Sequence, residues 1–295
     1  MILPRNENEL IKLLTGKWRY SPKVVCGVGD DCAVIAGASP GRYILLKTDA
    51  IVEGRHFTAE AAPAKIGHKA IARVISDFAA MGGIPQFAVV TLFIPPSFNL
   101  KRLTAIYAGM DKTARAYGMN LVGGETTRAT DFALNIAAIG EADKRHLTLR
   151  STAKTGDLVF VTGSLGGSIK GKHLSFTPRL NEAKWLVRHF KPTAMMDLSD
   201  GLGEDLPRLA SASGLSYQID PGNIPRQRGA SLDEALSDGE DYELLFTLPP
   251  SKSQNLQKAW KDIYQKLRLT CIGKMGSNKQ SSTTLSHGFD HLRYK

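Results

Sequence analysis

Strand-like and helix-like segments alternate through the first half of the chain. Apolar runs such as "YILLKTDAI" and "FAVVTLFI" have strand character, whereas Pro63–Met81 has amphipathic helical spacing and stops at Gly82-Gly83. A chain with this alternation must form a sheet and pack helices against it. The expected series is strand 43–51, helix 63–81, strand 87–94, helix 100–117 and strands 120–124 and 132–142.

The pattern begins again with "LVFVTG" at residue 158. The sequence therefore predicts an α/β (α+β) protein of two domains, residues 1–145 with a mixed sheet and helices, and residues 146–295 with an α/β arrangement. The expected later segments are a helix near 181–190, a strand at 193–199, a helix after Gly201, and strands at 215–219, 242–248 and 269–275.

Several classes of protein do not fit this chain. No run approaches 18 apolar residues, so we expect no membrane-spanning helix. The first residues lack the basic-then-apolar order of a secretory signal and predict a loop, then a helix capped by Asn6 with Glu9 three residues on. Cys26, Cys32 and Cys271 form neither a disulfide framework nor a CxxC pair. We therefore expect a cytoplasmic protein with reduced cysteines.

The formal net charge of +10 suggests nucleic-acid binding at first sight. From Ser251 onward, however, nine Lys or Arg and two Asp give +7 (9 − 2), so most of the excess lies in one C-terminal segment. Its apolar residues Leu256, Trp260, Ile263 and Leu267 have helical spacing, which predicts a helix with a solvated basic face. We therefore expect no nucleic-acid partner.

A glycine-rich stretch after residue 163 resembles a phosphate-binding loop. Gly166, four residues, Gly171 and Lys172 follow a predicted strand, but His173 stands where a magnesium-binding Ser or Thr belongs, and the spacing to the strand is long. We expect a glycine-rich connection, and any use of ATP without a phosphate loop of this kind.

Short acidic motifs beside glycines or at the ends of predicted elements are the stronger signal. Taken singly, most fit ordinary turns and helix caps, because Asp favours both. The residues concerned are Asp30, Asp31, Thr48, Asp49, Asp77, Glu125, Asp197, Ser199, Asp200, Asp238, Glu240 and Asp241.

Asp77 is the hardest of these to explain as a turn residue. It falls inside the apolar arc of the predicted helix 63–81 and near its C-terminus, where the helix dipole disfavours an anion. Arg73, four residues earlier, would compensate by only about 0.2–0.5 kcal/mol. A carboxylate so placed needs a cation from elsewhere, and Mg²⁺ takes oxygen ligands of this type together with phosphates.

The short acidic motifs, taken in their order along the chain, resemble those of the thiamine-phosphate kinase (thiamine-monophosphate kinase) family. This family belongs to the aminoimidazole-ribonucleotide-synthetase-like superfamily. The resemblance runs from "GVGDDCAV" to "GFDH" and includes "KTD", "SDFAAMGG", "DLSDGL" and "GEDYEL". It implies Mg²⁺-dependent transfer of the γ-phosphoryl group of ATP to thiamine phosphate. It also implies a homodimer made by the N-terminal domains, which bind metal and ATP, while the C-terminal domain completes the nucleotide and thiamine-phosphate site.

The resemblance also assigns roles to individual residues. Glu125 stands where the family usually has Asp, and the segment between Arg150 and Asp197 is shorter than the family's by roughly one helix. Several Mg²⁺ ions would be held by Asp31, Lys47 (through its carbonyl), Thr48, Asp49, Asp77, Glu125, Asp197 and Asp200. ATP would contact Tyr107, Gly124, Glu125, Arg150 and Ser199, and thiamine phosphate would contact His56, Glu240 and Phe289.

This chemistry suits the residues present. An acceptor phosphate with a second pKa of about 6 is mostly ionised at pH 7, so no general base is needed. The obstacle is repulsion between two polyanions, which metal ions held by carboxylates relieve. The cationic thiazolium of the acceptor suits the aromatic face of Phe289 and the charge of Glu240.

Three other readings stay open from the sequence. They are a metal-dependent phosphohydrolase, another ATP-using enzyme of the superfamily such as an aminoimidazole-forming ligase, and a non-catalytic anion or nucleic-acid binder that uses the basic C-terminal segment. "GEDYELLF" and "GFDH" favour the kinase over the ligase, and no nucleophilic Asp motif supports the hydrolase.

Overall fold

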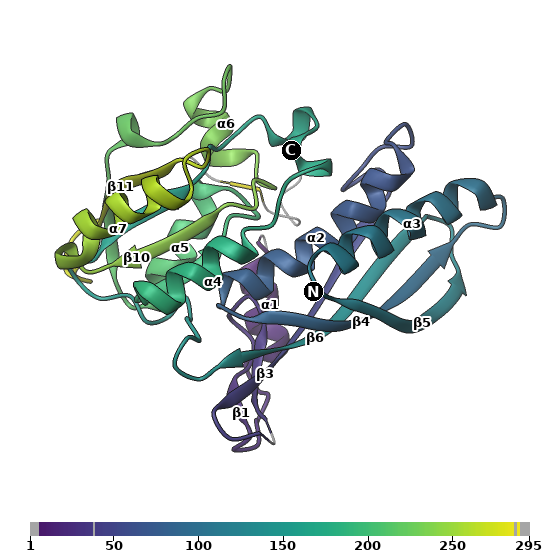
Figure 1. Ribbon diagram of the computed structural model, residues 1–295, viewed down its shortest axis with the longest axis horizontal. Helices are drawn as coiled ribbons and strands as arrows, with labels where there is room; N and C mark the ends of the chain where they lie inside the picture. The colour runs from purple at the N-terminus through teal and green to yellow at the C-terminus, as the bar shows by residue number, and fades with distance from the viewer. Residues whose placement is uncertain (1–5, 38, 286–287, 290–295) are drawn as a thin grey trace. The chain divides into compact units, whose positions relative to one another are not determined.

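The computed structural model describes residues 6–37, 39–285 and 288–289. Packing divides the chain into two compact units (Figure 1). Unit 1 comprises residues 1–30, 148–169 and 190–295, and unit 2 comprises residues 31–147 and 170–189. The predicted α/β class is confirmed, while the functional division of labour between residues 1–145 and 146–295 stays a prediction.

Unit 2 contains a mixed sheet with the strand order β2-β3-β6-β4-β5. Only β4 and β5 run parallel, and the other neighbours are antiparallel. The helices α2 and α3 lie along this sheet (Figure 1). The bounds are β2 Ala33–Ala36, β3 Arg42–Val52, α2 Pro63–Ala80, β4 Ile84–Ile94, α3 Leu100–Ala116, β5 Asn120–Arg128, β6 Ala133–Asp143 and α4 Leu180–His189.

The two faces of the unit 2 sheet differ in exposure. Leu45 and Ile136 are buried, as expected for the face that packs against helices. On the opposite face, Leu46, Ile139 and Phe87 are register partners across β3, β6 and β4, and each is 39–46% exposed. The sheet therefore presents one face with an apolar stripe that the described chain leaves uncovered.

Unit 1 contains an antiparallel sheet with the order β8-β10-β7-β11-β9. Its strands are short and mostly buried, because helices and loops of the unit cover them. The bounds are α1 Glu7–Thr15, β1 Val24–Cys26, β7 Leu158–Thr162, β8 Ala194–Asp197, α5 Leu202–Ala212, β9 Ser216–Ile219, α6 Leu232–Ser237, β10 Leu244–Leu248, α7 Pro250–Ile263 and β11 Leu269–Gly276. Short 3₁₀ helices cover Ser168–Lys170, Lys172–Leu174 and Pro221–Asn223.

The C-terminal basic segment differs in part from its prediction. α7 buries Leu256 and Trp260, as the helical spacing predicts, but it ends at Ile263, which is 53% exposed. Leu267 lies beyond the helix, where its carbonyl oxygen accepts a hydrogen bond of 2.7 Å from the Trp260 indole nitrogen. The predicted stripe is therefore one turn too long, because the chain turns after Ile263 and Leu267 bonds back to the helix.

Two other sequence features have clear outcomes. The Asn6 side chain accepts a hydrogen bond from the Glu9 amide, so the predicted N-cap of α1 is confirmed, and the loop predicted before it lies outside the described residues. No helix in the described part of the chain has the length and apolar character needed to cross a membrane.

The packing of α2 against α3 depends on two glycines. A Cβ added at Gly67 of α2 would overlap the carbonyl oxygen of Ile106 and lie 2.7 Å from the Met110 amide nitrogen. A Cβ at Gly109 of α3 would likewise overlap the carbonyl oxygen of Ala64. The two helix backbones can approach this closely only because neither position carries a side chain.

We predict that Gly67→Ala destabilises the protein, although helix propensity alone would make the change stabilising by about 0.8–1 kcal/mol. Overpacking at a backbone contact costs about 1–3 kcal/mol and should dominate. Chemical denaturation followed by circular dichroism measures the free energy of unfolding. Lys65→Ala, at an exposed position of the same helix, is the control and should change it little. A more stable Gly67→Ala variant would contradict the close helix contact.

Candidate functional site

Two predicted metal ligands lie side by side in unit 2. One carboxylate oxygen of Asp31, just before β2, lies within 4.8 Å of one of Asp77, in the last turn of α2, and each residue is only 6% exposed. The neighbouring backbone is fixed, because the Cys32 amide donates to the Met81 sulfur at 3.0 Å. Oxygen ligands this close, and buried, are suited to a hard divalent cation.

A lysine supplies positive charge to this pair. The Lys47 ammonium of β3 donates to Asp77 Oδ1 at 2.8 Å. Burial works to lower the pKa of Lys47, but the charges of Asp77 and Asp49 outweigh it and raise the pKa above its ordinary value. The structure thus gives the Lys47 side chain a role, where the family resemblance implied only its carbonyl.

Asp49 has its own cation on α2. Arg73 Nε lies 3.1 Å from Asp49 Oδ2, and Arg73 Nη1 donates to the Ala50 carbonyl oxygen at 2.9 Å. Helical spacing gave Asp77 as the partner of Arg73. It could not indicate Asp49, because Asp49 lies on a different element, β3. Lys47, Asp49, Asp77 and Arg73 therefore form one charged network between β3 and α2, with Asp31 beside it. We call these five residues the acidic cluster.

The remaining predicted residues of unit 2 lie around the sheet and α3. The Thr48 hydroxyl bonds Asn135 Oδ1 across β3 and β6 at 3.0 Å. Glu125 on β5 is exposed, and its carboxylate accepts from the Thr126 amide at 3.0 Å. Gly124 is the register partner of Val90, where a Cβ would overlap the Val90 carbonyl oxygen. Half-buried Tyr107 lies on α3, and burial raises its pKa. No described contact ties Glu125 to the acidic cluster.

His56 is held by a buried lysine that the sequence analysis missed. The Val52 amide donates to His56 Nδ1 at 3.0 Å, so the neutral ring carries its proton on Nε2. The fully buried Lys69 Nζ donates to the His56 carbonyl oxygen at 2.5 Å and lies 2.7 Å from His173 Nδ1. The sequence signal was available: Lys69, Arg73 and Asp77 lie four residues apart and form a polar stripe along α2.

In unit 1, the predicted residues after β8 are arranged around an arginine. Asp197 is buried at the end of β8, and Asp200 forms an ion pair with Arg208 of α5. Arg208 also donates to Asp205 Oδ1 at 3.0 Å, and the Asp200 amide donates to Asp205 Oδ2 at 3.0 Å. Burial, then the charge of Asp200, raises the pKa of Asp205. Arg208 therefore neutralises part of the acidic segment 197–205.

Three residues predicted to bind substrate or nucleotide converge on the same loop. The Glu240 amide donates to the Ser199 carbonyl oxygen at 2.7 Å, and the Phe289 amide donates to the Asp200 carbonyl oxygen at 2.8 Å. Glu240 (φ 52°) has left-handed backbone geometry, as does Tyr242 (φ 51°). Such strain in non-glycine residues is often found at functional sites. Asp290 and His291 of "GFDH" lie outside the described residues.

Arg150, the remaining predicted nucleotide contact, lies against Asp30. Its amide donates to Asp30 Oδ2 at 3.1 Å, and its Nε lies 3.5 Å from Asp30 Oδ1. The Arg150 side chain is only 15% exposed and is paired with Asp30, so its orientation is restricted.

The glycine-rich stretch does not have the geometry of a phosphate loop. The Gly166 amide donates to the carboxylate of Asp241 at 3.0 Å, and the Gly167 amide donates to Asp238 at 2.7 Å. A phosphate loop keeps such amides for the nucleotide and leads directly into an α-helix, whereas short 3₁₀ helices follow here. The protein's own carboxylates therefore occupy the positions that phosphates would take.

Comparison with known proteins gives a consistent result. The family model "AIR synthase related protein, N-terminal domain" matches residues 29–142. The chain is 33% identical to the thiamine-monophosphate kinase of Bacillus subtilis, over 95% of this chain and 94% of that protein. It is 34% identical to that of Rhodopirellula baltica, over 84% and 83%. The solved structure of AaThiL complexed with AMPPCP and TMP has a TM-score of 0.82 at 27% identity, covering 97% of both chains.

We predict that Lys172→Ala leaves the affinity for ATP unchanged. In a phosphate loop, the lysine contact is worth about 1.5–3 kcal/mol, so its loss would weaken binding roughly tenfold or more. A fluorescence titration with a labelled ATP analogue measures the affinity. Lys258→Ala, which removes one exposed charge from α7, is the matched control. A selective loss of affinity in Lys172→Ala would overturn the assignment of this stretch as a structural connection.

Proposed function

Because this chain belongs to the thiamine-monophosphate kinase family, we propose that it transfers the γ-phosphoryl group of ATP directly to thiamine phosphate and so forms thiamine diphosphate. The observation that carries the proposal is the acidic cluster, and within it the buried Asp31–Asp77 pair. A role in a turn or a helix cap would not explain why two carboxylates are buried next to each other.

The donor set fits magnesium. Asp31 and Asp77 offer carboxylate oxygens within 4.8 Å of each other, and carboxylates are preferred ligands of Mg²⁺. We propose these two residues as ligands, together with Thr48, Asp49, Glu125, the Lys47 carbonyl, Asp197 and Asp200. When bound, Mg²⁺ would neutralise phosphate charge and so allow two polyanions to approach.

The protein groups position the two phosphates. The acceptor phosphate is already ionised at pH 7, so no side chain has to remove a proton from it. Lys47 and Arg73 hold the carboxylates of Asp77 and Asp49 in fixed orientations, which preorganises the site before the substrates arrive. Arg150, oriented by Asp30, is proposed to contact the nucleotide phosphates. Tyr107, Gly124, Glu125 and Ser199 are proposed as further ATP contacts.

We propose three residues as contacts of thiamine phosphate: His56, Glu240 and Phe289. The tautomer of His56 places a donor at Nε2, which suits a phosphate oxygen. The backbone amides of Glu240 and of Phe289, a residue that is 46% exposed, bond to the loop that carries Ser199 and Asp200. An acid and an aromatic face together suit the cationic thiazolium ring. A cytoplasmic location follows from the sequence features alone and stays a prediction.

We propose that a second copy of the chain covers the apolar stripe of the unit 2 sheet. Leu46, Ile139 and Phe87 are exposed side by side on three adjacent strands. A contiguous apolar face of this kind indicates an interaction surface, and a self-complementary one fits a two-fold dimer.

We predict that Asp77→Asn lowers kcat/KM for thiamine diphosphate formation by at least about a hundredfold, the scale expected when a preorganised charge at the transferring group is lost. A coupled assay with ATP, Mg²⁺ and thiamine phosphate measures the rate. Asp111→Asn, an exposed residue of α3, is the control and should retain activity. A folded Asp77→Asn variant with wild-type activity would remove the basis of the proposal. Phosphate release without an acceptor would favour the phosphohydrolase instead.

We predict that Ile139→Lys converts a dimer into monomers, because it places a charge in the centre of the apolar stripe. Light scattering after gel filtration should give twice the 32.0 kDa chain mass for the unmodified protein and one chain mass for the variant. Leu100→Lys, at a 75% exposed position of α3, should stay dimeric. A monomeric unmodified protein, or a dimeric Ile139→Lys variant, would contradict the proposed interface.

A further inference from the structure

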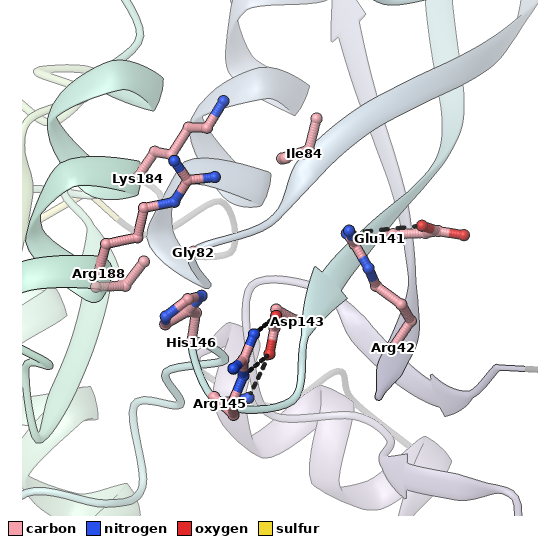
Figure 2. A pocket seen from close by; sticks show the side chains of 10 residues that line it. Arg42, Gly82, Ile84, Glu141, Asp143, Arg145, His146, Lys184 and Arg188 are labelled. Atoms are coloured by element: carbon pink, nitrogen blue, oxygen red, sulfur yellow. Dashed lines mark hydrogen bonds and ion pairs between the residues drawn. The ribbon is translucent and has the colours of Figure 1, made fainter. Parts of the chain in front are cut away.

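A second charged site lies within unit 2, at a cavity of about 390 Å³. Gly82, which follows α2, forms part of its wall (Figure 2), and Val187 of α4 also lines it. A Cβ at Gly82 would lie 2.6 Å from the His146 carbonyl oxygen and 3.0 Å from a Val187 methyl, so this wall is closely packed. The volume is at the small end of the range for ligand pockets, roughly 300–1,000 Å³.

Cationic side chains from three separate parts of the sequence line this cavity. Arg42 begins β3, Arg145 follows β6, and Lys184 and Arg188 lie on α4 (Figure 2). His146 adds an imidazole beside them. Such convergence from distant segments is not explained by a local preference for basic residues in one helix.

The acids of the cavity are already engaged with two of these cations. Both carboxylate oxygens of Asp143 accept from Arg145, at 3.0 and 2.7 Å, and Glu141 lies 3.9 Å from Arg42. Counting four cations and two acids, with His146 neutral, the lining carries a net +2 (4 − 2). A ligand that neutralises this lining needs at least two negative charges.

Lys184 and Arg188 form no ion pair with any other described residue. They lie four residues apart on α4, so they share one face, where like charges destabilise an isolated helix. In Figure 2 both project from α4 to the same side of the cavity. The helix dipole favours a cation at Arg188, in the last turn of α4, but it does not account for Lys184 or for Arg42 and Arg145 on other elements.

The cavity is separate from the acidic cluster. Arg42 pairs with Asp143, and Lys47 of the acidic cluster pairs with Ala138 in the same β3–β6 ladder, so five residues of β3 separate the two positions. At about 3.3 Å per residue these two backbone positions are roughly 16–17 Å apart. The same strand therefore runs from a basic cavity to an acidic cluster.

We propose that this cavity binds a compact polyanion of the phosphate class, with inorganic diphosphate as its simplest member. Guanidinium and ammonium groups are well suited to phosphoryl oxygens. Ile84 and Val187 are the apolar side chains of the lining, so it offers little surface to an organic group. This favours the free anion over the diphosphate end of a larger molecule. The proposal rests on unit 2 alone and does not require the proposed kinase activity.

Calorimetric titration of the full chain with diphosphate, in EDTA, tests the proposal. EDTA removes divalent cations, so binding that requires a metal at the acidic cluster is absent. We expect one bound diphosphate per chain, and Lys184→Gln/Arg188→Gln should weaken it at least roughly tenfold, which is about 1.4 kcal/mol. Lys101→Gln/Lys112→Gln, which removes the same charge from exposed positions of α3, should bind like the unmodified protein.

Other outcomes overturn the proposal or part of it. No binding in EDTA, an undiminished affinity in Lys184→Gln/Arg188→Gln, or an equal loss in the α3 control would each overturn the site. Citrate binding as tightly as diphosphate would overturn the assignment to phosphate. ADP or thiamine diphosphate binding more tightly than the free anion would overturn the preference for a free anion. An inactive but diphosphate-binding protein would refute the proposed function and leave this site intact.

Discussion

The buried approach of Asp31 to Asp77 is the interaction on which the account of the site depends. Two ionised carboxylates within 4.8 Å of each other repel by roughly 3 kcal/mol at an effective dielectric constant of about 20. The fold tolerates the pair because Lys47 of β3 forms an ion pair with Asp77, and Arg73 of α2 forms another with Asp49. A protein that needed only stability could replace such a group with apolar residues at little cost. Its presence here is therefore best explained by a cationic ligand.

The β3 strand organises both charged regions of unit 2. It begins with Arg42 at the basic cavity and carries Lys47 and Asp49 of the acidic cluster further along, before it ends at Val52. Pairing with β6 over its whole length keeps Arg42, Lys47 and Asp49 in fixed register. The close packing of α2 on α3 supports the same arrangement, since α2 carries Lys69, Arg73 and Asp77. A loss of packing at Gly67 would therefore shift α2 and, with it, the side chains that α2 contributes to the site.

Sequence reasoning located the elements better than their charge partners. Hydrophobic periodicity predicted α2 to within one residue at its end, and the capping pattern predicted Asn6 as the N-cap of α1. Arg73 was assigned to Asp77 by helical spacing, which cannot reveal that β3 brings Lys47 and Asp49 alongside. Six-residue α6 was missed because it is too short for periodicity, although its Ser231–Glu234 capping box was readable. The position of Asp77 against the helix dipole predicts a cation from another element, and Lys47 of β3 is one such cation.

The most direct test is a crystal structure of the protein grown with Mn²⁺ in place of Mg²⁺, together with a non-hydrolysable ATP analogue and thiamine phosphate. Anomalous scattering identifies manganese independently of the electron-density interpretation. We expect anomalous peaks bonded to the carboxylates of both Asp31 and Asp77. Peaks bonded only to other residues, with Lys47 as the sole cation on Asp77, would contradict it.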